Sequence, residues 1–209
     1  MLQATRVPSQ RRPVRTPEVR VRVIAGSHKG RRLLGPKGHT LRPTPDRVKA
    51  ALFSILGDRI LDARVLDLFA GTGAIGIEAL SRGASAVTFV EPDTESLRLL
   101  RANLTRCQLE EAADLQACTA EAFLRHSRAG GTFDIAFADP PYALDSGAHL
   151  LPSLSRAGIL TSDSVVVLEH ATRQPPPDEV GRLIRHRQYR YGDTTLSLYH
   201  VRNEGDPSS

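Results

Sequence analysis

From residue 64 onward, short apolar runs alternate with amphipathic segments, and this alternation is the strongest constraint on the fold. Five apolar runs predict buried strands, at 64–69, 86–90, 113–118, 133–138 and 164–169. Helical periodicity predicts helices between them, at 74–81, 94–106, 120–128 and 147–157. This order predicts an α/β fold with a doubly wound, mostly parallel sheet. Ligands of such sheets bind at the carboxyl ends of the strands.

Two further strands are predicted at the end of the chain. Residues 183–190 and 194–201 form an expected antiparallel pair around a turn at Gly192-Asp193, which brings the sheet to seven strands. We therefore expect the α/β domain to span residues 61–202. The polar segment 203–209 is expected to be a disordered tail.

A smaller N-terminal extension is expected at residues 19–60. Its first part alternates as a strand over 19–25 and returns over 31–34, which predicts a β-hairpin. Thr44 is suited to cap a helix that begins at Pro45 and runs to about Leu56. The Arg- and Pro-rich residues 1–18 are expected to be a disordered basic arm.

Charge is divided unevenly along the 209 residues. Residues 1–49 hold 13 Lys and Arg against two acids, a net charge of +11. The remaining 160 residues hold 15 basic and 21 acidic residues, a net charge of −6. A basic end on a mildly acidic body indicates a polyanion held by one end of the molecule.

Other classes of protein receive little support from the sequence. The seven histidines show no metal-binding spacing, so no metal site is expected. Cys107 and Cys118 are expected to be reduced thiols. No apolar run is long enough to cross a membrane, and the sequence shows no signal-peptide pattern. We expect a cytoplasmic protein without membrane contacts, and a monomer because no coiled-coil segment is present.

A glycine-rich loop follows the first strand of the sheet and opens a helix. It runs from Asp67 through Phe69 to Gly71 and Gly73. Glycines allow the backbone to turn sharply and to approach a ligand closely. Gly71, Gly73 and Gly76 also match the dinucleotide fingerprint, and Glu91 after the second strand is placed for a ribose hydroxyl. A nicotinamide dinucleotide is therefore a rival ligand at this point.

Asp67 favours another cofactor. An acid four residues before the first glycine can receive a cationic amino-acid head group, whereas a pyrophosphate beside it would be repelled. Phe69 is a candidate pocket residue, although a core role is equally compatible. The turn at Thr119 and Ala120, after the third strand, is expected to meet an adenine amine.

The fourth strand is followed by Asp139-Pro140-Pro141-Tyr142. The prolines stiffen the backbone and remove two N–H donors, so this segment presents acceptors only. The Asp139 carboxylate and the Pro140 carbonyl can together hold both hydrogens of an amine. Tyr142 offers a ring on which a base can stack. The motif therefore predicts methylation of an exocyclic base amine.

At these residues the chain resembles the RsmD family of bacterial methyltransferases, which act on guanine N2 of small-subunit (16S) ribosomal RNA. The likeness covers roughly residues 20–201. The matching segments are 22–26, 29–33, 41–48, 51–53, 67–73, 78–83 and 139–142. Asp-Pro-Pro-Tyr is shared by many amino-methyltransferases, so the segment Arg42-Pro43-Thr44-Pro45-Asp46-Arg47 is the discriminating part.

The resemblance implies S-adenosylmethionine (SAM) as cofactor and ribosomal RNA, or a partly assembled small subunit, as partner. It implies Asp67, Gly71, Gly73 and Glu91 at the cofactor, with Asp139 and Tyr142 at the target amine. The extension would bind RNA through a set of six basic residues and one threonine, here called the basic group: Arg22, Lys29, Arg31, Arg32, Arg42, Thr44 and Arg47. In one departure, Thr119 stands where many related enzymes carry an Asp that accepts from adenine.

Three alternatives remain open. The first is methylation of another amine: adenine N6, cytosine N4 or a protein glutamine. The second is a nicotinamide-dependent oxidoreductase. The third is an RNA-binding module with an inactive site, which would tolerate Asp139→Ala.

Overall fold

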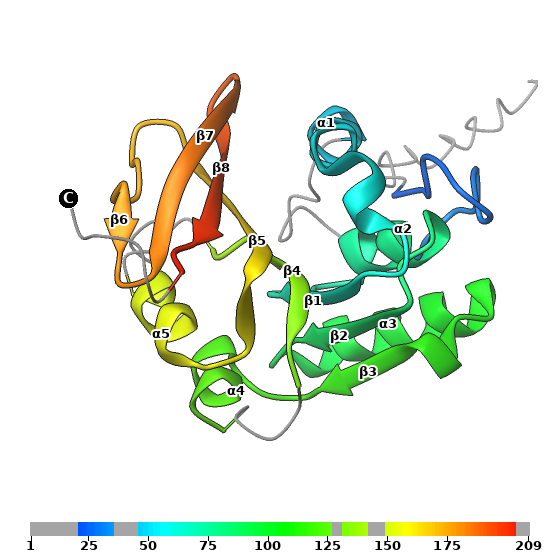
Figure 1. Cartoon of the computed structure of the whole chain (residues 1–209). Coiled ribbons are helices and arrows are strands. Elements are labelled where there is room, and N and C mark those ends of the chain that lie inside the picture. The colour runs from blue at the N-terminus through cyan, green and yellow to red at the C-terminus, as the bar shows by residue number, and fades with distance from the viewer. Residues whose placement is uncertain (1–20, 36–45, 127–130, 142–148, 204–209) are drawn as a thin grey trace, which may run out of the picture.

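The computed structural model describes residues 21–35, 46–126, 131–141 and 149–203 (Figure 1). The strands are β1 (Arg64–Leu68), β2 (Ala86–Val90), β3 (Ala113–Gln116), β4 (Phe133–Ala138), β5 (Leu160–Ala171), β6 (Glu179–Val180), β7 (Leu183–Tyr191) and β8 (Thr194–Val201). The helices are α1 (Asp46–Leu56), α2 (Ala74–Ser81), α3 (Thr94–Cys107), α4 (Ala120–His126) and α5 (Leu150–Arg156). Short 3₁₀ turns lie at Gly57–Ile60 and Glu110–Ala112.

All eight strands belong to one sheet, in the order β3-β2-β1-β4-β5-β8-β7-β6. The strands β1 to β5 pair in parallel, and β5, β8, β7 and β6 pair antiparallel. This confirms the doubly wound α/β prediction. The two-residue strand β6 at one edge adds an eighth strand to the seven expected, and it is too short to leave a periodic signal in the sequence.

Chain order reverses between β1 and β4, which are neighbours at the centre of the sheet. In the register of these two strands, Asp67 pairs with Phe137 and Leu68 with Ala138. The residues that follow Leu68 and Ala138 therefore emerge side by side at the carboxyl edge. This is the position at which doubly wound sheets bind ligands.

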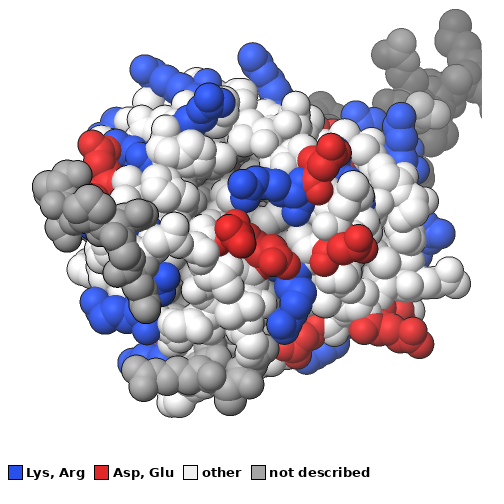
Figure 2. All heavy atoms as spheres, in the orientation of Figure 1, with Lys and Arg blue, Asp and Glu red and all other residues white. Residues whose placement is uncertain are grey.

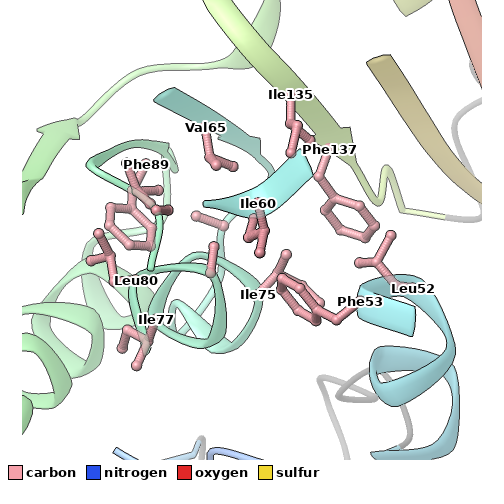
Figure 3. Packing of buried hydrophobic residues seen from close by; sticks show 14 of the residues in the cluster. Leu52, Phe53, Ile60, Val65, Ile75, Ile77, Leu80, Phe89, Ile135 and Phe137 are labelled. Atoms are coloured by element: carbon pink, nitrogen blue, oxygen red, sulfur yellow. The ribbon is translucent and has the colours of Figure 1, made fainter. Parts of the chain in front are cut away.

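Helices cover both faces of the sheet (Figure 1). On one face α1, α2 and α3 pack against inward-facing strand residues, as Figure 3 shows for Leu52, Phe53 and Ile75 around Val65 and Phe137. On the other face, side chains of α4 and α5 pack against the alternate strand residues; they include Leu124, Leu151 and Leu154. Full burial of each such side chain stabilises the fold by about 1.5–3 kcal/mol, so both helical layers are needed to hold the sheet.

The predicted N-terminal hairpin is present, with one isolated bridge between Arg22 and Arg32. The amide of Val23 donates to the Arg31 carbonyl, and the amide of Leu33 donates to the Val21 carbonyl, each at 2.9 Å. Val21, Val23 and Leu33 are buried in the same cluster as α1 and α2. Packing of these side chains on the α/β domain thus helps to fix the hairpin.

Several boundaries differ from the expected ones. Strand β5 is twelve residues long, because its first part pairs with the start of β4 before a register shift at Phe133–Ile135. The predicted cap residue Thr44 lies outside the described residues, as do segments 1–18 and 204–209 of the expected arm and tail. Among the residues that are described, no helix is long and apolar enough to cross a membrane.

Candidate active site

The loop between β1 and α2 turns back through several left-handed backbone conformations. Phe69, Gly71 and Gly73 have φ values of 65°, 53° and 82°. A Cβ on Gly73 would lie 2.2 Å from Leu100 Cδ1, so a larger residue there would displace this side chain of α3. A Cβ on Gly71 would meet nothing within 4 Å. The backbone at Gly71 is therefore not covered by a side chain and faces open space, so a ligand can approach it closely.

Asp67 lies at the end of β1 and is 1% exposed. Its Oδ2 accepts a hydrogen bond of 3.0 Å from the amide of Gly76 in α2. Burial, together with the nearby charges of Asp139 and Glu91, raises the pKa of Asp67 to about 7, although the hydrogen bond from the Gly76 amide opposes the shift. Three carboxyl groups thus act on one another at this edge. A cationic ligand would relieve their repulsion.

Glu91 directly follows β2 and supports the glycine loop from the side. Its Oε2 accepts from the amide of Gly71 and its Oε1 from the amide of Asp93, both at 2.8 Å. Its own amide donates to the Gln116 carbonyl of β3. A carboxylate oxygen has two lone pairs, so each oxygen keeps the capacity for one more donor, such as a ribose hydroxyl.

The structure brings the predicted reaction motif to the same edge. Asp139 is half-buried and Pro140 buried directly after β4, and Pro141 is exposed. The last residue of β4, Ala138, lies between Leu68 of β1 and Leu168 of β5. Tyr142 lies outside the described residues.

Thr119 lies between β3 and α4, directly before Ala120, the first residue of α4. The Thr119 Oγ1 accepts from the amide of Ala122 at 3.2 Å, and its carbonyl accepts from the amide of Phe123 at 2.9 Å. Thr119 therefore caps the helix with its side chain while remaining exposed. Ala120 is buried and has no side chain with which to recognise a ligand.

The described members of the predicted basic group are all exposed: Arg22, Lys29, Arg31, Arg32 and Arg47. Arg22 forms an ion pair of 3.0 Å with Asp46, and Arg31 donates to the Arg106 carbonyl. Figure 2 shows basic side chains on the right, where the hairpin lies in Figure 1, and others on the upper left, near β7 and β8. Arg42 and Thr44 lie outside the described residues.

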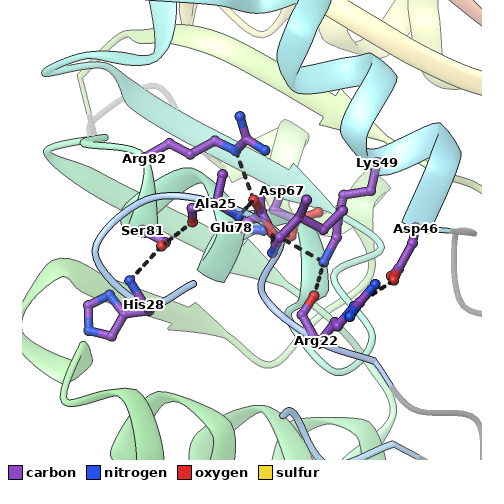
Figure 4. A network of polar contacts seen from close by, with 11 residues as sticks. Arg22, Ala25, His28, Asp46, Lys49, Asp67, Glu78, Ser81 and Arg82 are labelled. Carbon is purple, nitrogen blue, oxygen red and sulfur yellow. Dashed lines mark hydrogen bonds and ion pairs between the residues drawn. The ribbon is translucent and has the colours of Figure 1, made fainter. Parts of the chain in front are cut away.

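A buried polar network ties the extension to the domain (Figure 4). The Glu78 carboxylate of α2 accepts from the amides of Ile24 and Ala25 at 2.7 and 2.9 Å. It also forms ion pairs with Lys49 of α1 at 3.3 Å and Arg82 at 2.8 Å. The sequence analysis missed this network, because a Lys and a Glu in two different helices carry no signal of their contact.

Two further observations define the limits of the site. An open groove of about 610 Å³ lies elsewhere, on the sheet face covered by α4, and it contains none of the predicted site residues. Within the described ranges, no three His, Cys, Asp or Glu side chains lie together in a way that could hold a metal ion.

The doubly wound sheet, the loop after β1, the acid after β2 and the Asp-Pro-Pro segment after β4 define the fold of SAM-dependent methyltransferases. A family model described as "Conserved hypothetical protein 95" matches residues 21–200. The chain therefore belongs to this family.

Relatives along almost the whole chain support the assignment. YlbH of Bacillus subtilis is 37% identical over 183 residues, which are 87% of this chain and 100% of YlbH. Ribosomal RNA small subunit methyltransferase D of Escherichia coli is 33% identical over 186 residues, 89% of this chain and 92% of that protein. The solved structure of yhhF from Escherichia coli superposes with a TM-score of 0.78 at 31% identity, covering 88% and 98% of the two chains. These findings confirm the resemblance to the RsmD family.

Proposed function

We propose that the protein transfers a methyl group from SAM to the exocyclic N2 amine of a guanine in small-subunit ribosomal RNA. The observation that carries the proposal is the convergence of Asp67, Glu91 and Asp139 at one edge of the sheet, beside the open backbone of Gly71. A relative that is 33% identical over 89% of the chain is named as a ribosomal RNA small subunit methyltransferase. This likeness supports RNA as the substrate.

The residues present suit SAM, which supplies a methyl group on a cationic sulfur. The carboxylate of Asp67 suits the ammonium of the amino-acid moiety, directly or through water. Glu91 suits the ribose hydroxyls, and the backbone of Gly71 and Gly73 permits close approach. Phe69, Thr119 and Ala120 are the candidates around the adenine, where backbone groups supply recognition because the Thr119 hydroxyl already caps α4.

At the target, the Asp139 carboxylate and the Pro140 carbonyl accept the two N–H groups of the guanine amine. This holds the nitrogen lone pair in line with the methyl group, a positioning effect. The N–C bond forms as the S–C bond breaks, and the proton left on the methylated nitrogen passes to Asp139 or water. Tyr142 is proposed to stack on the base.

The basic residues of the extension are proposed to hold phosphates beside this edge. Arg22, Lys29, Arg31 and Arg32 lie on the hairpin, and Arg47 lies at the start of α1. Arg42 and Thr44 complete the proposed group. The partner is then ribosomal RNA or a partly assembled small subunit, bound in the cytoplasm by one copy of the chain.

The test is a methyl-transfer assay with radiolabelled SAM. Its substrates are naked small-subunit ribosomal RNA, partly assembled small subunits, duplex DNA and bulk protein, and the product is identified by nucleoside analysis. Label in N2-methylguanosine that disappears with Asp139→Ala is the expected result. Label in another nucleoside, in DNA or in protein would support methylation of an amine but reject guanine N2 of ribosomal RNA as the target.

No transfer to any substrate would favour the oxidoreductase or the RNA-binding module. These two are separated by adding SAM or NAD to the protein and measuring its melting temperature, because only a true ligand raises it by mass action.

A further inference from the structure

Asn103 in the third turn of α3 is completely buried and makes three hydrogen bonds outside its own helix. Its Oδ1 accepts from the amide of Leu34 at 2.6 Å. Its Nδ2 donates to the carbonyls of Leu34 and Thr72, both at 3.0 Å. One amide side chain thus contacts two segments that are far apart in the sequence.

The two segments belong to different parts of the proposed machinery. Thr72 lies between Gly71 and Gly73 in the loop proposed to bind SAM. Leu34 ends the returning half of the hairpin, just before the chain continues towards Arg42. Asn103 is the only residue in the described hydrogen bonds that contacts both the glycine loop and the hairpin through one side chain.

Asparagine is an unexpected choice at this position if packing alone decides it. It is a weaker helix former than Leu or Ala, and a buried amide costs free energy unless it is hydrogen-bonded. Its neighbours on the buried face of α3, Leu100 and Leu104, are apolar. The Asn103 amide is therefore explained by the two backbone segments that it connects.

We propose that Asn103 is a positioning residue that couples the cofactor loop to the RNA-binding hairpin. A ligand on the loop restricts the motion of the Thr72 carbonyl, and this restricts the amide that donates to it. The same amide holds both polar groups of Leu34, so the end of the hairpin is ordered before RNA arrives. The inference rests on the proposed function, because it takes the hairpin as an RNA site and the loop as a SAM site.

Coupling of this kind is reciprocal. If the cofactor strengthens RNA binding by a certain factor, RNA strengthens cofactor binding by the same factor. Couplings between sites commonly amount to about 5- to 150-fold. For the unmodified chain we expect each ligand to raise the affinity for the other about fivefold or more. The effect would arise because the loop and the hairpin become more ordered, without a change in their conformation.

The experiment uses S-adenosylhomocysteine (SAH) and transcribed small-subunit ribosomal RNA as probes of the full chain. RNA affinity is measured with and without SAH, and SAH affinity with and without RNA. The variant is Asn103→Ala. Its matched control is Ser164→Ala, because Ser164 is also buried and its Oγ donates to the Phe133 carbonyl at 2.7 Å, at the amino end of the strands, opposite the site.

The expected result is that Asn103→Ala binds SAH and RNA separately but loses the mutual strengthening, whereas Ser164→Ala keeps it. Strengthening that persists in Asn103→Ala, or none in the unmodified chain, would overturn the proposal.

A second measurement needs no variant and no RNA. Hydrogen exchange of the Leu34 amide is followed in the unmodified chain, and SAH is expected to slow it at least about fivefold. Protection confined to residues 70–73 would contradict the coupling even though SAH binds. Complete absence of SAH binding would instead overturn the proposed function together with this inference. If SAH still slows exchange of the Leu34 amide but guanine is not methylated, only the proposed substrate is rejected.

Discussion

Lys49 and Glu78 form an ion pair of 3.3 Å in which both side chains are at most 1% exposed. Burial lowers the pKa of Lys49, and the adjacent Glu78 carboxylate opposes this shift. The Lys49 ammonium also donates to the Arg22 carbonyl at 2.6 Å, so the pair connects α1, α2 and the hairpin. The position of the N-terminal extension therefore depends on two charges that water does not reach.

Loss of the buried cation should destabilise the protein strongly. Lys49→Met is expected to lower the free energy of unfolding by about 3 kcal/mol, because Glu78 would keep a buried charge with one fewer partner. Urea denaturation measures the change. The control is Arg98→Met, which breaks the exposed pair with Glu95 and should hardly change stability. Equal effects of the two substitutions would show that burial does not determine the contribution of the pair.

The two loop glycines should respond differently to a methyl group. Gly73→Ala places a Cβ against Leu100 in addition to its φ of 82°, so we expect a clear fall in melting temperature. Gly71→Ala meets open space and should cost only about 1–2 kcal/mol in backbone strain. Calorimetric titration with SAH should nevertheless show weak binding by Gly71→Ala, since its Cβ occupies the ligand's side of the loop. Unchanged SAH affinity in this variant would place the cofactor elsewhere.

Asp67 should make both stability and cofactor binding depend on pH. Its pKa of about 7 lies above the ordinary value of 3.8, so the folded chain binds more protons than the unfolded chain between these values. The resulting stability is complete below pH 3.8 and is lost as the pH rises through about 7. The SAH ammonium binds the ionised form of the Asp67 carboxyl group. The affinity for SAH should therefore increase as the pH rises towards the pKa of Asp67, by up to about tenfold per pH unit.

Asp67→Asn is the variant that checks this assignment. The amide oxygen can still accept from Gly76, but the side chain no longer titrates. SAH affinity of the variant, measured by titration between about pH 6 and pH 8, should be low and nearly constant. A pH dependence equal to that of the unmodified chain would assign the titration to another group.

The proposed phosphate contacts should appear in the salt dependence of RNA binding. Arg47→Ala is expected to weaken binding and to reduce the slope of log K against log salt by about 0.7, the contribution of one contact to single-stranded RNA. Filter binding at several salt concentrations measures the slope. Arg156→Ala, an exposed arginine at the end of α5, serves as the control and should leave it unchanged. If Arg47→Ala also leaves the slope unchanged, Arg47 has no phosphate partner.

The sequence predicted those features that depend on local pattern. Strand β4, helix α2 and the final hairpin have clear periodicity, and the glycine loop and Glu91 occur at strand ends that the pattern defines. The sequence alone therefore predicted that Asp67, Glu91 and Asp139 lie at the same edge of the sheet.

The features that were missed depend on contacts between distant residues. Asn103 and Leu34 are 69 positions apart, and Glu78 and Ile24 are 54 apart. Neither residue type nor spacing distinguishes a buried Asn that bridges two loops from an exposed one on a helix surface. The capping role of Thr119 was overlooked for a related reason, since a ligand role and a cap use the same hydroxyl.

The position of β8 has a consequence for synthesis of the chain. Among the described strands it is the last to be made, yet it lies inside the sheet between β5 and β7. Until residues 194–201 leave the ribosomal exit tunnel, β5 has an unpaired edge that could join another chain. A stop codon shortly before Thr194 should therefore give an aggregating product, although every proposed catalytic residue has already been translated.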